Sequence, residues 1–308
     1  MSVLVSICCL TYNHAAYIRE CLDGFLMQRT DSPVEIIVHD DASTDGTRDI
    51  LREYQARYPD RFHLILQTEN QYSKGVNVAI QYIFPRVRGK YIAFCEGDDY
   101  WTDPDKLQKQ VDFLEAHPDY SMCCHATKQY MQQTDELCDW KLPKRVEGRS
   151  FSFTCREWID YGWFFWPLSI VIRKESLDLP FLAACPRCRD VHTFYSLLRH
   201  GKGYFFQECM SVYRRHDAGI WSGISFERRK IEGANNAYEI YRVDRNPDTR
   251  WMVASALGEL LIFYLRYEPH FWKALKVFPT TYRYCGWKGL FDVSSYIRKK
   301  IVNRYFTR

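Results

Sequence analysis

Three carboxylates stand within four residues in the segment Glu96-Gly97-Asp98-Asp99, which directly follows the apolar run 91–95. Because like charges this close repel one another, a loop of this composition is destabilised unless a cation neutralises it. Carboxylate oxygens are hard ligands that suit Mg²⁺ or Mn²⁺. The segment, called the acidic loop below, therefore predicts a site for one of these two ions at the end of a buried strand.

The elements that must hold this loop follow a regular rhythm. In the first 125 residues, short β-branched stretches alternate with longer amphipathic ones. Such alternation predicts an α/β fold with a mainly parallel sheet and helices on both of its faces. We expect strands at 3–10, 34–39, 62–67, 91–95 and 120–124, and helices at 15–28, 47–58, 76–84 and 104–117.

The second part of the chain has a looser pattern. From residue 226 onward, apolar residues recur at helical spacing without a strand signal. This predicts a mixed half followed by a helical C-terminal region, whose last part, 266–308, holds ten Lys or Arg against two acids. Between residues 125 and 226 we expect a polar stretch at 129–149, helices near 154–161 and 191–200, and strands at 168–172 and 204–214.

Polar residues gather where the expected strands of the first half end. Ligands of an open α/β sheet bind beyond the carboxyl ends of its strands, so we expect one site to collect these residues. Taken singly, each group also has an ordinary structural explanation, such as a turn at Asp45-Gly46 or a helix start at Asp103-Pro104. The groups are Thr11-Tyr12-Asn13, segment 40–46, segment 71–75 and the acidic loop.

Several classes of protein are disfavoured. The first strand-end turn, 10–14, has no glycine and so is not a dinucleotide-binding fingerprint, and the chain has no Gly-x-x-x-x-Gly-Lys run. A formal net charge of +4 over 308 residues gives little reason to expect nucleic acid as a partner. No window reaches the roughly 18 to 20 apolar residues that cross a bilayer. Residues 1–7 lack a basic leader, so we expect a cytoplasmic protein, soluble or peripheral.

Twelve cysteines would indicate a disulfide framework in a short secreted chain, but here they lie mainly in apolar runs of a long one. We expect most of them to be buried, reduced thiols. Cys185 and Cys188 have the spacing of a metal or redox pair. No second such pair completes a zinc site, so zinc is disfavoured.

Three blocks, 5–13, 35–47 and 90–99, resemble the family 2 glycosyltransferases, which have the GT-A fold. The blocks keep the order and spacing of that family and cover roughly the first 125 residues. Departures are mild: Leu10 stands where proline is common, Ala42 where glycine is common, and Glu96 where aspartate often opens the acidic motif. The Gln-x-x-Arg-Trp signature of processive synthases is absent, since Pro247 stands at its Gln position.

The resemblance implies a nucleotide-sugar donor, with a UDP-sugar favoured, and Mn²⁺ or Mg²⁺ as the cofactor. It places Tyr12 near the base, Asp41 in a bond to the base, and Asp98 and Asp99 at the ribose and the metal. Lys74 is expected to meet the diphosphate, although a solvated surface lysine is an equally good explanation. The expected nucleotide-sugar-binding residues are Thr11, Tyr12, Asn13, Asp41, Lys74 and Asp98.

The family's catalytic base is an Asp that begins a helix in the second half, and Asp190 fits that place. Its alternative role is that of a helix N-cap. Being exposed beside Arg189, its carboxyl is expected to be ionised near neutral pH. In relatives a loop like segment 213–222 closes over the diphosphate, which makes His216 a candidate third metal ligand beside Asp98 and Asp99, with a surface or core histidine as the alternative.

The resemblance also assigns the halves of the chain. Residues 1–225 are expected to form the glycosyltransferase domain, with a nucleotide-sugar-binding half at 1–125 and an acceptor and catalytic-base half at 126–225, followed by the helical basic region 226–308. Aromatic residues of the acceptor half, Trp158 and 163–166, offer faces on which sugars stack, although core packing explains them equally well. The expected pocket-lining residues are Glu96, Trp101, Arg189 and Trp221.

The C-terminal segment 296–306 places Ile297, Ile301 and Tyr305 on one helical stripe among basic residues. Such a stripe suits an anionic membrane surface, where a lipid-linked acceptor would be found. A helix packed on the domain explains it equally well.

The expected reaction is an inverting transfer of a sugar to a hydroxyl of a glycan or lipid-linked acceptor, in bacterial surface-polysaccharide synthesis. Two competitors remain. A sugar-nucleotide pyrophosphorylase would need a glycine-rich, basic first loop, which segment 11–14 does not supply. A non-catalytic subunit that binds a sugar nucleotide or a membrane surface would keep the fold without turnover.

Overall fold

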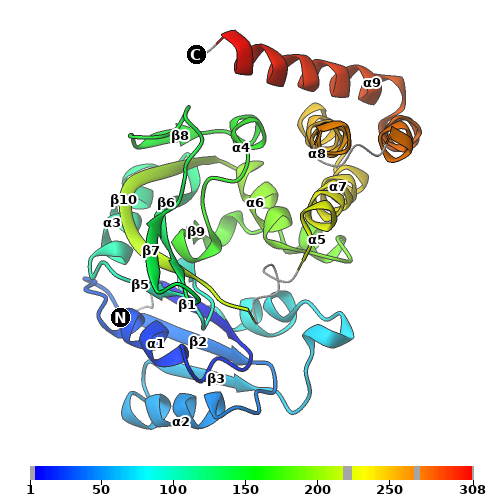
Figure 1. The fold of residues 1–308 in the computed structure, drawn as a ribbon. Coiled ribbons are helices and arrows are strands. Elements are labelled where there is room, and N and C mark those ends of the chain that lie inside the picture. Colours follow the sequence, from blue (N-terminus) through cyan, green and yellow to red (C-terminus); the bar gives the residue numbers. More distant parts are fainter. Residues whose placement is uncertain (1–3, 218–223, 267–270, 307–308) are drawn as a thin grey trace.

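The computed structural model describes residues 4–217, 224–266 and 271–306 (Figure 1). Their strands form one ten-stranded sheet in the order β3-β2-β1-β4-β9-β6-β10-β5, with β7 beside β6 and β8 beside β10. The strands are β1 (Val5–Thr11), β2 (Val34–Asp40), β3 (Phe62–Leu66), β4 (Tyr91–Phe94), β5 (Tyr100–Trp101), β6 (Tyr120–Met131), β7 (Glu136–Asp139), β8 (Phe151–Phe153), β9 (Val171–Arg173) and β10 (Lys202–Arg215).

The first half of the sheet is parallel, as predicted: β1 pairs in parallel with β2 and β4, and β2 with β3. Successive residues of these strands alternate between two apolar clusters, so that Ile7 and Ile36 enter one cluster while Cys8 and Ile37 enter the other. One cluster includes residues of α1, α2 and α3, and the other includes residues of α6, α7 and α8. Helices therefore cover both faces of the sheet (Figure 1).

The helices follow the predicted positions with shorter ends. The segment 76–84, predicted as a helix, instead forms a π-helical turn at Ala79–Ile83 followed by a 3₁₀ turn at Phe84–Arg86, where Pro85 interrupts the regular ladder. The α-helices are α1 (Ile18–Leu26), α2 (Thr47–Arg57), α3 (Lys106–Ala116), α4 (Cys155–Tyr161), α5 (Leu179–Ala183), α6 (Asp190–Leu198), α7 (Phe226–Val243), α8 (Pro247–Arg266) and α9 (Phe271–Phe306).

The second half of the sheet differs from the prediction in two ways. The strand β6 continues to Met131, and β7 pairs with it, so part of the stretch predicted to be merely polar is a hairpin. The strand β9 lies antiparallel to both β4 and β6. The 14-residue strand β10 lies beyond β6 and pairs in parallel with the whole length of β6. Shifts of the register along β10 bend this strand.

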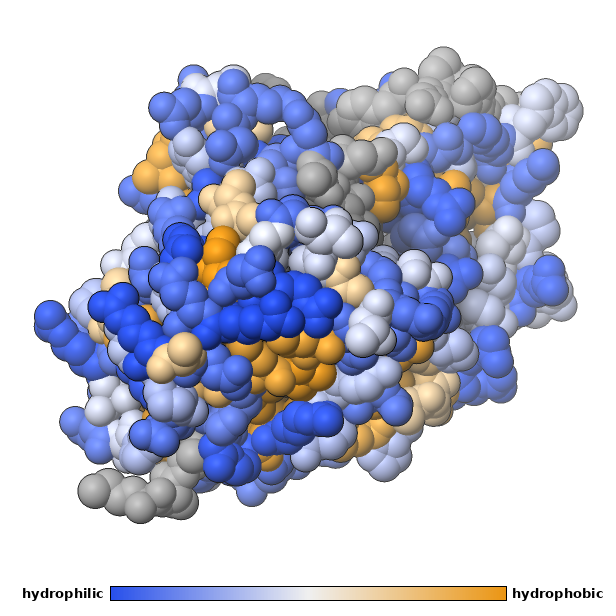
Figure 2. Space-filling model, turned by 90° about the horizontal axis from the view of Figure 1, so that it is seen from below, coloured by the Kyte–Doolittle hydropathy of each residue, from blue (hydrophilic) through white to orange (hydrophobic). Residues whose placement is uncertain are grey.

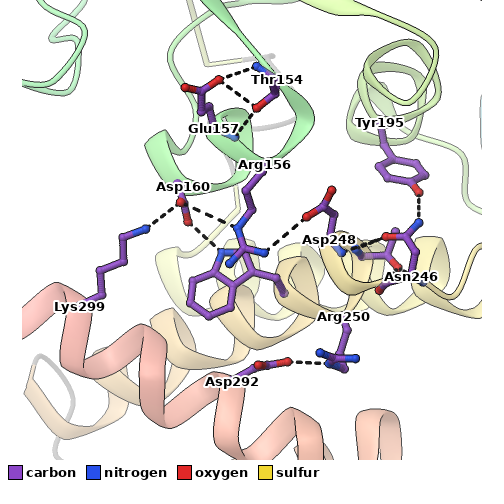
Figure 3. A network of polar contacts seen from close by, with 12 residues as sticks. Thr154, Arg156, Glu157, Asp160, Tyr195, Asn246, Asp248, Arg250, Asp292 and Lys299 are labelled. Atoms are coloured by element: carbon purple, nitrogen blue, oxygen red, sulfur yellow. Dashed lines mark hydrogen bonds and ion pairs between the residues drawn. The ribbon is translucent and has the colours of Figure 1, made fainter.

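The C-terminal helices α7, α8 and α9 pack on one another and form a layer beside α4 and α6 (Figure 1). Polar contacts attach this layer to α4 (Figure 3). Trp251 Nε1 donates a hydrogen bond to Asp160 Oδ1 at 2.8 Å, and Lys299 Nζ lies 2.7 Å from Asp160 Oδ2. Arg156 lies 3.4 Å from Asp248 and stacks over the Trp251 ring. Within the described residues, no helix is long and apolar enough to span a membrane.

The edge of the sheet at β3 faces the viewer when the molecule is seen from below (Figure 2). Hydrophilic residues cover most of this face, and a compact apolar area lies near its centre beside strongly hydrophilic residues. Four of the five β3 residues are half-buried. This is typical of an edge strand shielded by charged neighbours rather than by another strand.

All twelve cysteines are free, and eight of them are buried. This confirms the prediction that most are buried, reduced thiols. Burial raises the pKa of Cys124 and Cys8 well above the usual range, so these thiols act as small apolar side chains.

Candidate active site

The turns after β1 and β2 are joined by hydrogen bonds. Asn13 takes a left-handed φ of 56°, which lets its backbone N–H reach Ser43 Oγ at 2.8 Å while its side-chain Oδ1 accepts from the Thr44 N–H at 2.9 Å. Asp45 Oδ2 accepts the Ala15 N–H at 2.9 Å. Two of the predicted strand-end groups therefore form one rigid surface at the same edge of the sheet.

Asp41 binds the third strand-end group to the same edge. Its two carboxylate oxygens accept the backbone N–H groups of Gln71 and Tyr72 at 2.8 and 2.9 Å. Lys74, in the same segment, pairs with Glu69 at the surface. The ring of Tyr12 is 46% exposed and so is accessible for stacking.

The acidic loop packs tightly against the first turn. A Cβ on Gly97 would lie 2.7 Å from Thr11 Oγ1 and 2.8 Å from Ile18 Cδ1, so only glycine fits there. Asp98 Oδ2 lies 2.9 Å from His216 Nε2 and 3.8 Å from His14 Nε2. The prediction placed Asp98 and His216 in one site, and the structure brings their ligand atoms into contact although the residues lie 118 positions apart.

Arg214, near the end of β10, holds the acidic loop from within. Its backbone N–H donates to Asp99 Oδ1 at 2.8 Å, and its Nε donates to the carbonyl of Asp98 at 3.0 Å. The guanidinium also pairs with Glu20 and stacks on three tyrosine rings. Asp99 is 2% exposed, and among the described residues Arg214 alone donates a hydrogen bond to its carboxylate, so the orientation of Asp99 depends on β10.

Crowding of the carboxylates shifts their pKa values in different directions. Burial raises the pKa of Glu96 to about 8, with the charges of Asp190 and Asp98 adding to the effect. Burial, with the charges of Asp98 and Glu96, raises the pKa of Asp99 well above its usual range. For Asp98, burial opposes ionisation, but the hydrogen bond with His216 and the charge of His14 outweigh it and lower the pKa. A bound cation would relieve the unfavourable charge at Glu96 and Asp99.

Asp190 is the first residue of α6 and does not cap the helix, since the N-cap position belongs to Arg189. Among the described residues, none donates a hydrogen bond to its exposed carboxylate. Although the carboxylate is exposed, partial loss of hydration next to the surrounding protein raises the pKa of Asp190. The positive charge of Arg189 lowers the pKa, but by less. The Arg189 guanidinium donates a hydrogen bond to the Tyr72 hydroxyl at 2.6 Å, and the expectation that Asp190 is ionised near neutral pH stays a prediction.

The turn that precedes Asp190 is fixed by side chains of α6 and α7. His192 Nδ1 accepts the Arg189 N–H at 3.0 Å, and Glu239 Oε1 accepts the Arg187 N–H at 2.8 Å. Ligand atoms of His192, Glu239 and Cys185 lie within 4.8 Å of one another, a spacing that could hold a metal ion. His192 Nδ1 and Glu239 Oε1, by accepting these backbone N–H groups, hold the turn that leads to Asp190.

The predicted pocket-lining aromatic residues have different places. Trp101 is 2% exposed and donates its indole N–H to the Leu168 carbonyl at 2.8 Å, so it lies in the core below the acidic loop and does not fit the expectation that it lines the site. Trp166 stacks on Tyr213 with ring centroids 4.3 Å apart. Trp221 lies outside the described residues.

Two residues of the site, Arg214 and His14, were not predicted individually. Both stand in segments that were singled out: His14 directly follows the first strand-end turn, and Arg214 precedes His216 by two positions. For His14, its position just after the end of the first strand could have indicated that it belongs to the site. For Arg214, nothing in the sequence tells which of the adjacent Arg214 and Arg215 turns inward.

By residue type, the donors at the acidic loop suit a divalent cation of the Mn²⁺ or Mg²⁺ type, but among the described residues the ligand atoms of Asp98, Asp99 and His216 do not all come within 4.8 Å of one another. Asp98 supplies a carboxylate oxygen, Asp99 a second carboxylate, and His216 an imidazole nitrogen, a mixture that Mn²⁺ accepts well. His216 Nδ1 is buried without a hydrogen-bond partner among the described residues, so its Nε2 is the nitrogen that faces the carboxylates.

Comparison with known proteins identifies the family. Residues 6–178, more than half of the chain, match the family described as Glycosyl transferase family 2. The chain belongs to this family. It is 30% identical over 242 residues to TuaG of Bacillus subtilis, described as a putative teichuronic acid biosynthesis glycosyltransferase, with 78% of this chain and 87% of TuaG covered.

Other similar proteins extend this picture. The uncharacterized protein Rv1520 of Mycobacterium tuberculosis is 40% identical over 233 residues, which cover 74% of this chain and 63% of that protein. The chain thus spans less than two thirds of that relative's length. The solved structure of S. aureus TarS 1-349 in complex with UDP-GlcNAc has a TM-score of 0.66 at 17% identity, with 98% and 92% of the two chains covered. The predicted GT-A fold of a family 2 glycosyltransferase is confirmed.

Proposed function

We propose that the chain transfers a sugar from a nucleoside-diphosphate sugar to a hydroxyl of a glycan or lipid-linked acceptor, with inversion at the anomeric carbon. The observation that carries this proposal is the approach of carboxylates from the two halves of the molecule. Asp190, at the start of α6, is near enough to Glu96 in the acidic loop for its charge to add to the rise that burial causes in the Glu96 pKa. A donor bound at the loop would lie beside a carboxylate free to accept a proton.

The joined strand-end turns form the donor site in this proposal. Tyr12 offers an exposed ring for stacking on the base, and Asp41, fixed by two N–H groups, keeps acceptor capacity for a base N–H. Thr11, Asn13 and Asp98 border the sugar and ribose positions, and Lys74 is placed at the diphosphate after exchanging its surface partner Glu69. The UDP-GlcNAc held by TarS supports a UDP-sugar as the donor.

Asp98, Asp99 and His216 would hold the metal ion, Mn²⁺ or Mg²⁺. When bound, the ion offsets negative charge on the diphosphate. The protein keeps the ligands in place through Arg214, whose N–H orients Asp99 and whose Nε orients the backbone of Asp98. Removing this support should affect the metal site indirectly, through the positions of the two carboxylates.

Asp190 acts as the general base. The acceptor hydroxyl oxygen forms a bond to the anomeric carbon, its proton passes to the Asp190 carboxylate, and the bond from the anomeric carbon to the phosphate oxygen breaks, releasing the nucleoside diphosphate. A single displacement of this kind inverts the configuration. The raised pKa of Asp190 suits proton abstraction near neutral pH better than an unperturbed aspartate would.

The acceptor is proposed to belong to surface-polysaccharide synthesis, in line with the description of TuaG as a putative teichuronic acid biosynthesis glycosyltransferase. Its binding surface would include Arg189 and the aromatic residues of the acceptor half. Trp163, which is 39% exposed, and the stacked pair Trp166 and Tyr213 offer flat faces of the kind that sugars pack on.

The test is a screen of UDP-, GDP-, dTDP- and CMP-sugars with Mn²⁺, reading nucleotide release. Asp190→Asn should lower turnover by about 10²- to 10⁴-fold while nucleotide binding is kept, because only the proton acceptor is lost. Asp112→Asn, an exposed aspartate on α3, is the matched control and should leave turnover unchanged. Turnover near the wild-type rate in Asp190→Asn would remove Asp190 from this role.

The same screen separates the two competitors. A non-catalytic subunit would bind a sugar nucleotide, measured by calorimetry, yet release no nucleotide with any acceptor extract. A sugar-nucleotide pyrophosphorylase would consume the sugar nucleotide only when pyrophosphate is supplied, and would produce a nucleoside triphosphate.

A further inference from the structure

Helix α9 has two apolar faces, and only one of them is covered. It bends at Gly286, where the backbone leaves helical geometry with a φ of 63° and a ψ of −160°. The inner face, which packs on the preceding helices, has buried residues at helical spacing. They are Ala274, Val277 and Thr281 before the bend and Val293 and Tyr296 after it.

The opposite face presents large aromatic side chains to solvent. Trp272 is 76% exposed, Trp287 is 75% exposed and Phe291 is 74% exposed. A surface helix of a globular protein normally carries polar residues on its outer face, and contiguous exposed apolar patches mark interaction sites. The members of this aromatic face are Trp272, Leu275, Phe278, Tyr282, Trp287 and Phe291.

The bend joins the two rows of aromatic residues into one surface. Tyr282, before it, and Trp287, after it, meet edge to face with ring centroids 5.2 Å apart. Together with Phe278, Pro279 and Leu290 they line an apolar depression of about 260 Å³. The surface is therefore continuous across Gly286.

Basic residues border the aromatic face. Lys276, Arg283, Lys288 and Arg298 are exposed, and among the described residues no acid pairs with any of them. Asp292, the acidic residue of this helix, is occupied by Arg250 at 2.6 Å. The face thus combines tryptophan, tyrosine and phenylalanine with uncompensated positive charge.

We propose that this face of α9 docks on the surface of an anionic lipid bilayer. Tryptophan and tyrosine favour the boundary between lipid headgroups and acyl chains, where one part of the ring is dry and another is wet. Lysine and arginine beside them are attracted to anionic headgroups. No helix among the described residues spans a bilayer, so the contact is one of a helix lying in the interface plane.

A second copy of the chain fits this face less well. In a two-fold symmetric contact the same patch meets itself, so the basic residues of both copies would face one another without acids between them. An anionic bilayer supplies the missing negative charge on one side.

The face proposed here differs from the stripe of residues that the sequence suggested for a membrane contact. Ile297, a member of that stripe, is half-buried and packs against the core, so it faces inward. The side chains of Ile301 and Tyr305 lie outside the described residues. Ile297, the member of the stripe whose side chain is described, therefore lies on the inner face, and the docking face proposed here lies mostly nearer to the start of α9.

Docking goes beyond the proposed transfer reaction and does not depend on it. It would place the enzyme where lipid-linked acceptors are found. Its test, lipid binding without any substrate, can fail while turnover on a soluble acceptor stands, and it can succeed in a chain that proves inactive.

The experiment is flotation of the full chain with vesicles of phosphatidylcholine, with and without phosphatidylglycerol. We expect the chain to float with the anionic vesicles, and high salt to reduce the bound fraction. The double variant Trp287→Ser/Phe291→Ser should lower the vesicle affinity by tenfold or more, and Lys276→Ser by about fivefold. Phe226→Ser, which removes an exposed aromatic residue of α7, is the matched control and should bind like the wild type.

Folding is checked by comparing the thermal unfolding of all variants, since the changed side chains are exposed and should leave it unaltered. Three results would overturn the proposal. They are failure of the wild type to float with anionic vesicles, equal flotation of the double variant and the wild type, and light scattering that shows a dimer which the double variant breaks.

Discussion

The acidic loop and the surroundings of Glu259 on α8 both gather charge, but they do so in opposite ways. Around Glu259, Lys230 lies at 2.9 Å, Lys300 at 3.0 Å and the Tyr296 hydroxyl at 2.6 Å, so one acid faces two cations and a donor. Burial opposes ionisation of Glu259, yet these partners lower its pKa to about 2. In the acidic loop, burial raises the pKa of Glu96 to about 8. One cluster is complete within the protein, and the other is left in need of a cation.

This contrast separates groups that stabilise the fold from groups that are kept for a ligand. Carboxylates that stabilise a fold have lowered pKa values, whereas unfavourable charge is retained where chemistry requires it. Substitutions in the two clusters should therefore act in opposite directions on stability and on activity.

The largest effect is expected at Asp98. Asp98→Asn removes a proposed metal ligand and the partner of His216, so nucleotide release with Mn²⁺ should fall by about 10²-fold or more. The thermal midpoint without metal should change little, because the loss of the His216 hydrogen bond that lowers the pKa of Asp98 is offset by less repulsion at Glu96 and Asp99. A large loss of stability with no change in turnover would show that Asp98 stabilises the fold as Glu259 does, and would contradict the contrast between the two clusters.

Lys106, which is buried in the core beneath the acidic loop, extends this comparison to a buried cation. Its Nζ donates to Gln110 at 2.8 Å and lies 4.0 Å from the Trp101 ring, and burial lowers its pKa to about 7. Below that pH both the folded and unfolded states hold the proton, so the folded state carries the full cost of a buried cation. As the pH rises through 7, the folded state loses the proton that the unfolded state keeps, and the cost decreases.

Lys106→Met should therefore raise the free energy of unfolding more at about pH 6 than at about pH 8.5, with a difference of about 2 kcal/mol between the two conditions. Loss of the hydrogen bond to Gln110 will offset part of the gain at both pH values. Denaturant unfolding of the variant and the wild type measures this, and a pH-independent difference would contradict the assignment.

The smallest effect is expected at Glu259. Glu259→Gln should lower the free energy of unfolding at neutral pH by about 1 to 2 kcal/mol, a range reduced for the partial exposure of the group. Because its folded pKa is lowered, the stability it supplies is present above the unfolded value and is lost as the pH falls towards 2. The variant and the wild type should converge only below about pH 2, while nucleotide release at neutral pH stays unchanged.

The meeting of the strand-end turns could be predicted because these turns follow strands with a clear alternating pattern. The position of the acidic loop after β4 and the meeting of three turns at one edge needed only the rule for strand ends. Ala42 shows a limit of this kind of inference. It takes a left-handed φ of 67°, so alanine holds here a conformation that glycine adopts more easily.

Contacts between distant segments were the part that the sequence could not supply. Glu239 and the Arg187 N–H lie 52 positions apart, and no local pattern reports that a glutamate on α7 fixes the turn before Asp190. The outer face of α9 was missed because Trp272, Trp287 and Phe291 are separated by the bend at Gly286, which breaks the helical spacing of the pattern.

The strand β10 has a consequence for how the protein is made. The acidic loop is synthesised long before Arg214 and His216, which complete its hydrogen bonds across 115 and 118 positions. Contacts of such long range close late, because the intervening chain must first be ordered. On the ribosome, the acidic loop must therefore remain without these partners until β10 has emerged. A chain that stops before residue 214 would keep the acidic loop without the Arg214 and His216 contacts that position Asp98 and Asp99.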